Sequence, residues 1–397
     1  MSARERWDVV VVGGGPAGSA MAARLASAGW SVLVLDRARF PRRKPCGECV
    51  NPAGVAALRD LGAWDAVAAA GFGRLDGWRI QSNRERGAAF FDGAFPDPLF
   101  GIAIQRAVFD TLLLDHAAAR GAVVRTGARV TGLVMEGDTV AGVRVVGEEG
   151  ETEIGARLVV GADGLRSVVL RRLGLVRRAP KLRKLALNAH VEGWSGKGGR
   201  GEVHVSGRGC VGVADVGGGR ANVTVVAAGV ETRAVGGDPE GYFERALQAY
   251  GFEGLVRVDE VLATGPFDFP VRCAVADGAL LVGDAAGYYD PFTGQGIYRA
   301  LHGAKLAAEV ADAALRADDL SAAALMPYER ARRRAFAPGE RVQKLVEAFV
   351  ARPAWLAAVA ERFTRRPALG DAMIRVTGDV SPARVLLRPG LVAGLFF

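Results

Sequence analysis

A glycine-rich turn between two apolar runs constrains the fold of this chain more than any other feature. Residues 8–12 (DVVVV) form a β-branched run that is typical of a strand buried on both faces. The run leads into the turn Gly13–Gly18 (GGGPAG) and an alanine-rich segment that predicts a helix closed by Gly29. A second apolar run, WSVLVLD, ends at Asp36. Strand, glycine turn, helix and strand in this order predict a Rossmann-type α/β fold with a parallel sheet.

Each glycine of this turn has its own physical task. Gly13 permits the tight turn, Gly15 lets backbone N–H groups approach a pyrophosphate, and Gly18 lets the helix pack closely on the strand. The helix N-terminus adds unpaired N–H donors and partial positive charge, which suit phosphate groups. Asp36, 18 residues after the last glycine, is placed to accept hydrogen bonds from ribose hydroxyls. The combination predicts a dinucleotide site for either NAD or FAD.

Two later segments repeat the pattern of an apolar strand that leads to an acid. Residues 156–167 (ARLVVGADGLRS) carry Asp163 directly after their apolar run. Residues 278–287 (GALLVGDAAG) carry Asp284 in the same place and lead into a long helical segment. Because ligands bind outside the carboxyl ends of parallel strands, both acids are expected in one crevice.

With these three motifs in this order, residues 7 to about 330 resemble the FAD-dependent para-hydroxybenzoate hydroxylase superfamily. The resemblance implies FAD as the cofactor, with Asp284 on its ribityl chain and Arg106 reaching its phosphates. It places Asp163 and Gly164 beside the pyrophosphate. The residues that it implies for FAD binding, including the 291–297 stretch against the isoalloxazine ring, are Gly13, Gly15, Pro16, Ala17, Gly18, Asp36, Arg37, Cys46, Arg106, Asp163, Gly164, Arg166, Gly283, Asp284, Pro291, Gly294, Gly296 and Ile297.

The stretch FPRRKPCGECVNPAG, residues 40–54, is similar to a loop of the geranylgeranyl reductase and flavin-dependent halogenase branch of that superfamily. The dipeptide Asn51-Pro52 predicts a helix start, so Cys46 and Cys49 lie in the loop that enters a helix. A zinc site needs further ligands at suitable spacing, which the sequence does not offer, and we predict no metal site. A dithiol exchange pair stays open. Our preferred interpretation is a loop that lines the cavity beside the flavin.

Three residues of this loop are candidates for catalysis, namely Lys44, Cys46 and Glu48. The Glu48 carboxylate is the best acid–base candidate. The competing interpretation is a salt bridge from Glu48 to Arg42, Arg43 or Lys44.

The expected architecture combines a Rossmann-type FAD-binding domain, an antiparallel β-sheet substrate domain and C-terminal helices. Short alternating strands with glycine turns between residues 180 and 270 predict the antiparallel sheet. Pro338, Pro353 and Pro367 are expected to break the C-terminal helices. The predicted boundaries are 1–75, 101–178 and 270–330 for the FAD-binding domain, 76–100 and 179–269 for the substrate domain, and 331–397 for the helical segment.

The predicted substrate domain lacks a motif that is typical of the halogenases and a motif that is typical of the prenyl reductases. Halogenases carry a WxWxIP motif and prenyl reductases a YxWxFP motif, whereas residues 210–216 (CVGVADV) hold no tryptophan. Small residues there predict a roomy cavity. Asn188, His190, His204 and Asp215 are candidates to line it, and we assign them no role because a lone strand histidine is usually structural.

One dinucleotide fingerprint and no second one predict that a separate NAD(P)H domain is absent. The superfamily resemblance implies that NAD(P)H visits transiently, or that a flavin reductase or ferredoxin supplies electrons. We expect a monooxygenase that acts through a flavin C4a-hydroperoxide on a lipophilic aromatic or polyketide-like molecule. The alternative is an alkene reductase of the geranylgeranyl reductase type. A halogenase using Lys44 and a non-catalytic prenyl-binding module rank lower. The intact Gly13, Gly15, Gly18, Asp36 and Asp284 argue against the last of these.

Composition sets the remaining expectations. The net charge of +8 comes mostly from scattered arginines, and no basic run interleaved with aromatics indicates nucleic-acid binding. Four cysteines in 397 residues are too few for a disulfide scaffold. The start lacks a signal peptide and no run is long enough to span a membrane, which predicts a cytoplasmic protein. The tail VLLRPGLVAGLFF is either a buried last element or a peripheral membrane contact.

Overall fold

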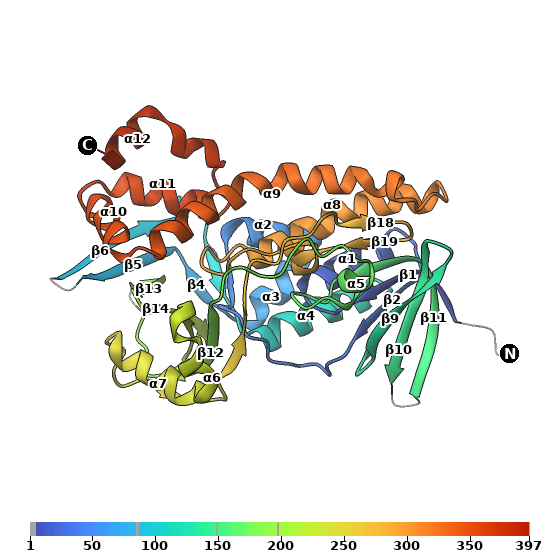
Figure 1. Ribbon diagram of the computed structural model, residues 1–397, viewed down its shortest axis with the longest axis horizontal. Helices are drawn as coiled ribbons and strands as arrows, with labels where there is room; N and C mark the ends of the chain where they lie inside the picture. The colour runs from blue at the N-terminus through green and yellow to red at the C-terminus, as the bar shows by residue number, and fades with distance from the viewer. Residues whose placement is uncertain (1–4, 85–86, 148–149, 197, 397) are drawn as a thin grey trace.

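The computed structural model describes residues 5–84, 87–147, 150–196 and 198–396. Its first sheet has the order β18-β19-β11-β1-β2-β8, with β9 and β10 joined to β11 by antiparallel pairing (Figure 1). Strands β1, β2, β8, β11 and β19 pair in parallel, as expected for a Rossmann-type sheet. The bounds of its strands are β1 Arg6–Val12, β2 Val32–Asp36, β8 Val123–Thr126, β9 Arg129–Glu136, β10 Thr139–Gly147, β11 Gly150–Gly161, β18 Val275–Ala276 and β19 Ala279–Leu281.

A second sheet has the order β16-β12-β15-β14-β13-β5-β6, with β17 paired to β12. Its pairings are antiparallel, as predicted, except that β13 and β5 run parallel. Its strands are β5 Gly77–Arg84, β6 Gly87–Ala94, β12 Leu185–Glu192, β13 Arg200–Ser206, β14 Gly209–Gly217, β15 Arg220–Ala227, β16 Val256–Arg257 and β17 Leu262–Thr264. A small third sheet joins β3 Cys49–Val50, β7 Gly101–Ala103 and β4 Gly73–Leu75.

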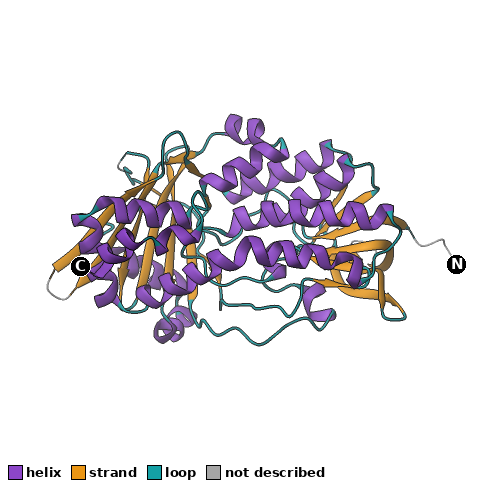
Figure 2. Cartoon of the chain, turned by 90° about the horizontal axis from the view of Figure 1, so that it is seen from above, coloured by secondary structure: helices purple, strands orange, loops and turns teal. Residues whose placement is uncertain are grey.

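Helices lie between the two large sheets, whose strands gather towards opposite ends of the molecule, and others lie over the second sheet (Figure 2). Helix α1 packs against β2, α4 and α8, and α9 packs against α8 and β18. The helices are α1 Pro16–Ser27, α2 Pro52–Leu61, α3 Trp64–Ala70, α4 Arg106–Ala119, α5 Val168–Arg172, α6 Thr232–Gly237, α7 Pro239–Ala249, α8 Gly296–Arg316, α9 Ala322–Val350, α10 Pro353–Arg365, α11 Pro367–Thr377 and α12 Pro389–Phe396, with 3₁₀ turns η1 Gly229–Glu231, η2 Gly283–Ala286 and η3 Ala383–Leu387.

The prediction that three prolines break the C-terminal helices is confirmed for Pro353 and Pro367 and wrong for Pro338. Pro353 and Pro367 begin α10 and α11, where a missing N–H costs nothing. Pro338 lies inside α9, which continues to Val350. A proline there removes one backbone hydrogen bond, but buried Tyr328 and Phe336 on the same helix are held by tertiary packing, which outweighs the local preference.

The C-terminal helices pack on the second sheet. Phe363 of α10 and Ile374 of α11 are buried in one apolar cluster with Phe95, which directly follows β6. No helix in the described part of the chain is long and apolar enough to cross a membrane. The expected membrane contact of the tail stays a prediction, and Phe397 lies outside the described residues.

Candidate functional site

In the glycine turn after β1, the fold leaves no room for a side chain at Gly18 and Gly13, whereas Gly15 has open space around it. A Cβ added to Gly18 would lie 1.8 Å from the carbonyl oxygen of Gly13, and one added to Gly13 would lie 2.5 Å from that of Ala162. A Cβ on Gly15 would meet only Arg42 Nη2, at 3.7 Å. No side chain caps the N-terminus of α1. The turn therefore has the free N–H donors and the open space that a pyrophosphate needs.

Asp36 ends β2 beside this turn and is buried. Its Oδ2 accepts a 2.8 Å hydrogen bond from the backbone N–H of Gly14, and its Oδ1 accepts one of 2.8 Å from Ala38. Each oxygen keeps a further lone pair for a ribose hydroxyl. The neighbouring Arg37 is exposed.

Arg42 is a charged residue at the turn that was not predicted to be a ligand from the sequence. Its Nη1 lies 2.9 Å from Asp110 Oδ2, and its Nη2 lies 3.9 Å from Asp36 Oδ2 and faces the open side of Gly15. The sequence feature that could have indicated Arg42 as a ligand is the basic run that follows β2. We interpreted that run as a source of salt-bridge partners for Glu48.

Arg106 lies at the start of α4 and is buried. Its Nε and Nη2 form two hydrogen bonds of 2.6 and 2.7 Å with the carboxylate of Asp110. Burial opposes its charge, but Asp110 and Cys46 together outweigh burial and raise the pKa of Arg106. Because Asp110 and Cys46 already interact with the guanidinium, contact with flavin phosphates stays a prediction.

The second motif, residues 161–164, lies at the end of β11 and beside the end of β1, since Ala162 N donates to the Val12 carbonyl oxygen at 2.8 Å. Asp163 Oδ2 accepts a 2.6 Å hydrogen bond from the N–H of Val168, whereas its buried Oδ1 has no partner among the described residues. Burial raises the pKa of Asp163. Gly164 has φ +79°, and a Cβ there would lie 3.7 Å from Lys44 Nζ. Arg166 instead donates to the carbonyl oxygen of Gly265 at 3.2 Å, which directs its side chain to the connection after β17.

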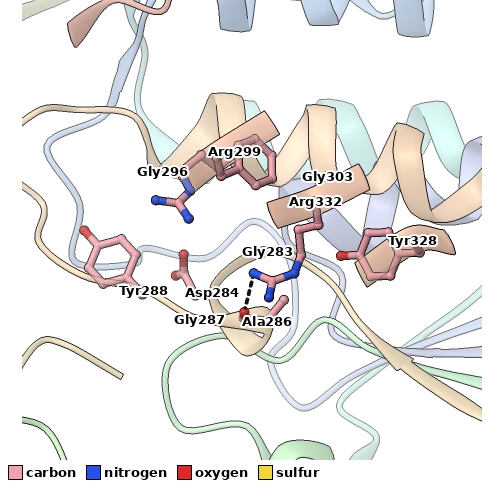
Figure 3. Close-up of a pocket in the computed structure, with 11 residues that line it drawn as sticks. Gly283, Asp284, Ala286, Gly287, Tyr288, Gly296, Arg299, Gly303, Tyr328 and Arg332 are labelled. Carbon is pink, nitrogen blue, oxygen red and sulfur yellow. Dashed lines mark hydrogen bonds between the residues drawn. The ribbon is translucent and has the colours of Figure 1, made fainter. Parts of the chain in front are cut away.

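The third motif, which contains Gly283 and Asp284, contacts the glycine turn that begins α1. A Cβ on Gly283 would lie 2.8 Å from the Cβ of Ala17, so η2 and the start of α1 are in direct contact. Figure 3 shows Asp284 beside Tyr288 and Arg299 among the residues that line one pocket. The Asp284 carboxylate has no hydrogen-bond partner in the described part of the chain and is only partly buried. Asp163 and Asp284 follow the neighbouring strands β11 and β19, and their sharing of one ligand crevice stays a prediction.

The stretch before α8 contains the remaining predicted residues. Pro291 and Gly294 form a turn closed by a 3.0 Å backbone hydrogen bond. Gly296 begins α8, whose N-terminus has no side-chain cap, and Ile297 is buried. Free N–H groups at a helix N-terminus suit the electron-rich edge of a flavin ring.

Asp379, which follows α11, joins this stretch to the loop that enters α2. Its Oδ1 accepts a 2.8 Å hydrogen bond from Gln295 Nε2, and its Oδ2 accepts one of 2.9 Å from Asn51 Nδ2. Asn51 also caps α2 through Gly54 N at 2.8 Å, as predicted. The sequence of the C-terminal segment shows no motif that points to this contact, because a single acid gives no local signal of a long-range partner.

The Asp379 contact predicts a pH-dependent stability. Burial raises the pKa of Asp379 to about 7, against the opposing hydrogen bonds of Gln295 and Asn51 and the charge of Arg299. The folded state thus binds more protons than the unfolded state between about pH 4 and pH 7, so this group makes stability fall as pH rises. We expect the unfolding free energy of wild type, relative to Asp379→Asn, to fall by on the order of 2 kcal/mol from pH 5 to pH 8 in urea titrations. A pH-independent difference would contradict the buried titration of Asp379.

The loop with the two cysteines is held by hydrogen bonds and not by a disulfide. Cys46 and Cys49 are free thiols. Cys46 Sγ accepts from the N–H of Glu48 at 3.3 Å, and Cys49 Sγ donates to the carbonyl oxygen of Gly47 at 3.0 Å. Burial raises the pKa of the Cys49 thiol, which makes it a poor nucleophile.

Glu48 is buried, at 3% exposure, with φ +60°. Its Oε1 accepts a 2.7 Å hydrogen bond from the backbone N–H of Arg106, and its Oε2 lies 2.8 Å from His190 Nε2 and 3.1 Å from Asn222 Nδ2. His190 Nδ1 lies 2.6 Å from Asp259 Oδ2. No salt bridge joins Glu48 to Arg42, Arg43 or Lys44 in the described structure, so the competing interpretation of that carboxylate is wrong.

His190 and its strand neighbours hold this loop on the second sheet. Pairing of β12 with β15 sets His190 opposite Asn222 and Asn188 opposite Thr224. Asn188 and Asn222 donate to the carbonyl oxygen of Cys46 at 3.0 and 3.1 Å. Burial disfavours a charged His190, but hydrogen bonds and charges from Glu48 and Asp259 outweigh it and raise its pKa.

Lys44 is the candidate of this loop that projects into the crevice. No described group forms a hydrogen bond with its Nζ, and burial, then the charge of Arg106, lowers the pKa of its ammonium. Asp284 acts in the opposite direction. An ammonium at this place would gain from a nearby anion such as a phosphate.

The site fits FAD. The open turn at Gly15, the buried Asp163 oxygen without a partner and the unpartnered Asp284 carboxylate lie along one crevice at the carboxyl ends of β1, β11 and β19 in the described structure. These are the features that a pyrophosphate and a ribityl chain use. Fold and site together define an FAD-dependent oxidoreductase.

The chain belongs to the FAD binding domain family, which matches residues 6–337. It is 32% identical over 339 residues to digeranylgeranylglycerophospholipid reductase 2 of Methanopyrus kandleri, covering 81% of each protein. It is 31% identical over 327 residues to the digeranylgeranylglycerophospholipid reductase of Methanosarcina mazei, covering 80% of this chain and 78% of that protein.

Solved structures agree on the fold. The myxobacterial chondrochloren halogenase has a TM-score of 0.80 at 25% identity, covering 98% of this chain and 92% of its own. A geranylgeranyl bacteriochlorophyll reductase-like protein from Thermoplasma acidophilum has a TM-score of 0.77 at 23% identity, covering 99% of both chains. The superfamily and branch inferred from the motifs are confirmed.

Proposed function

We propose that this protein is an FAD-dependent alkene reductase that saturates carbon–carbon double bonds of a lipophilic, isoprenoid-type substrate. The observation that carries the proposal is the similarity at 31–32% identity, over about four fifths of the chain, to relatives named as reductases of a digeranylgeranyl lipid. The missing YxWxFP motif was the reason to expect a monooxygenase instead. The relatives' names favour the alternative.

An apolar cluster of the second sheet and the C-terminal helices packs against the stretch before α8, close to where we expect the flavin ring. Val205, Cys210, Val350 and Leu356 are buried in one apolar cluster, against which Phe292 of the stretch before α8 packs. Burial raises the pKa of the Cys210 thiol to about 12, which keeps it neutral and compatible with an apolar surface. Residues 210–216, where the tryptophan motif is missing, are the strand β14 that contributes Cys210 to this cluster.

Bound FAD, once reduced, supplies a hydride, and saturation of one double bond consumes that hydride and one proton. We propose that NAD(P)H or a reduced partner protein restores the cofactor. Within the loop, Lys44 and Cys46 remain catalytic candidates, because both residues are only partly buried. Glu48 is a positioning residue, since three donors already occupy its carboxylate.

Anaerobic single turnover tests the proposal. The flavin of the holoprotein is reduced under nitrogen, and a detergent-dispersed geranylgeranyl lipid is added. We expect the visible flavin band to return without oxygen, with one double bond saturated per flavin reoxidised. If the flavin stays reduced until oxygen is admitted, and the product then contains one added oxygen atom, the monooxygenase is correct and the reductase is not.

A further inference from the structure

The connection from α5 to β12 is a cationic segment with a regular side-chain alternation. Residues 177–184 (RRAPKLRK) contain five lysines and arginines and no acid. The segment, green in Figure 1, is held by backbone hydrogen bonds from Arg177 N to Pro270 O at 3.1 Å and from Phe267 N to Leu182 O at 2.9 Å. The odd-numbered residues are exposed and the even-numbered residues are partly buried. An extended chain turns successive side chains to opposite sides, which explains this pattern.

The two cations on the inner side are neutralised by acids near the site. Arg178 Nη2 lies 2.6 Å from Asp268 Oδ2. Lys184 Nζ lies 3.2 Å from Asp290 Oδ2 and also contacts Glu347 of α9. Asp290 directly precedes the turn that leads into α8, so the segment is tied to the loop expected beside the flavin ring.

The three cations on the outer side have no such partners. Arg177, Lys181 and Arg183 are exposed, and no described residue forms an ion pair or side-chain hydrogen bond with them. We call these three residues the cationic edge. Lys181 and Arg183 are about 7 Å apart if the chain is fully extended, a spacing at which they repel each other weakly and can share an anionic surface.

Exposed aliphatic side chains border the cationic edge. Val230 in η1 is 83% exposed, and its neighbour Gly229 abuts Arg183, since a Cβ on this glycine would lie 2.9 Å from the Arg183 carbonyl oxygen. Val176, just before the edge, is 37% exposed.

We propose that the cationic edge is the surface by which this protein docks on an anionic lipid surface. Lysine and arginine gain from anionic headgroups, and exposed aliphatic side chains such as Val230 gain from the interfacial apolar layer. A purely acidic protein partner would use the charges and leave these aliphatic groups unexplained. The link from Lys184 to Asp290 places the docked surface next to the stretch before α8, which we expect beside the flavin ring. The part of this inference that concerns delivery of a lipid substrate rests on the proposed function, whereas the docking itself does not.

Vesicle flotation of the full-length holoprotein tests the docking without any turnover. Vesicles of phosphatidylcholine mixed with phosphatidylglycerol are compared with pure phosphatidylcholine, for wild type and for the triple variant Arg177→Gln, Lys181→Gln, Arg183→Gln. Each cation contributes about fivefold near an anionic surface, so the triple variant should lose about a hundredfold in partition coefficient. Wild-type binding should also fall steeply as salt is added.

The matched control removes three exposed arginines that form no ion pair in the described structure, Arg6 of β1, Arg120 after α4 and Arg129 of β9. This control should keep most of the binding, because it changes net charge equally without touching the edge. Equal losses in both triple variants, or failure of wild type to bind anionic vesicles, overturn the proposal. Binding to polyglutamate but not to vesicles identifies an acidic polypeptide as the partner and overturns it as well. Failure of anaerobic alkene reduction with intact vesicle binding rejects the proposed function alone.

Discussion

Gly18→Ala is expected to prevent stable folding of the FAD-binding part of this chain. The new Cβ would overlap the Gly13 carbonyl oxygen at 1.8 Å, and this partner is backbone that cannot rotate away. Gly13 itself is fixed, because its N–H donates to the Leu35 carbonyl oxygen at 2.7 Å and its α-carbon faces Ala162. Because α1 would have to leave the sheet, we expect a loss of at least about 3–5 kcal/mol, seen as insoluble protein or a strongly lowered midpoint in thermal unfolding.

Gly15→Ala is the matched control, because it adds the same methyl group three residues earlier in the same turn. Gly15 has φ −77°, which alanine adopts without strain, and its Cβ would meet only Arg42 Nη2, at 3.7 Å. We expect the variant to fold like wild type and to lose FAD affinity by about a hundredfold, since the methyl group occupies the approach of the pyrophosphate. Fluorescence titration of the apoprotein with FAD measures this. Unchanged FAD affinity in Gly15→Ala would mean that the pyrophosphate lies elsewhere.

The sequence alone was enough to place those residues of the candidate site that lie at the carboxyl ends of strands. Gly13, Asp163 and Asp284 follow three strands of one parallel sheet, so their meeting follows from the topology of the fold. The helix that starts after Asn51 was likewise predictable from its cap and its proline. Each of these features is encoded within about ten residues of chain.

The contacts that complete the site were not predictable, because they join residues far apart in sequence. Glu48 meets His190 only because β12 and β15 pair in a register that sets His190 opposite Asn222. Asp379 reaches Gln295 and Asn51 only after α10 and α11 have packed on the second sheet. Sequence periodicity reports which residues are buried but not which distant polar groups they meet, so His190 was left without a role.

Glu48→Ala is expected to destabilise the protein by about 3–5 kcal/mol, because it removes one partner of a buried charged network. The carboxylate accepts hydrogen bonds from Arg106 N, His190 Nε2 and Asn222 Nδ2. Without it the Arg106 N–H and His190 Nε2 lose their partner, whereas Asn222 keeps its hydrogen bond to the Cys46 carbonyl oxygen. Glu361→Ala provides the comparison for a surface ion pair. Glu361 binds exposed Arg365 one helical turn away, and its loss should cost less than about 1 kcal/mol.

Glu48→Gln tests whether the charge of this side chain stabilises the network or only its packing does. Glutamine keeps the shape of the glutamate side chain and removes its charge. His190 would then lose one of the two carboxylates that raise its pKa. In wild type the stabilisation from a charged His190 is fully present below its unfolded pKa, about 6.5, and is lost as pH rises through its higher folded pKa. In Glu48→Gln this loss should move to lower pH, while the variant costs less stability than Glu48→Ala at any pH. Urea unfolding measured between about pH 6 and pH 9 distinguishes the two cases. A parallel pH profile in both proteins would show that the charge of Glu48 does not control the titration of His190.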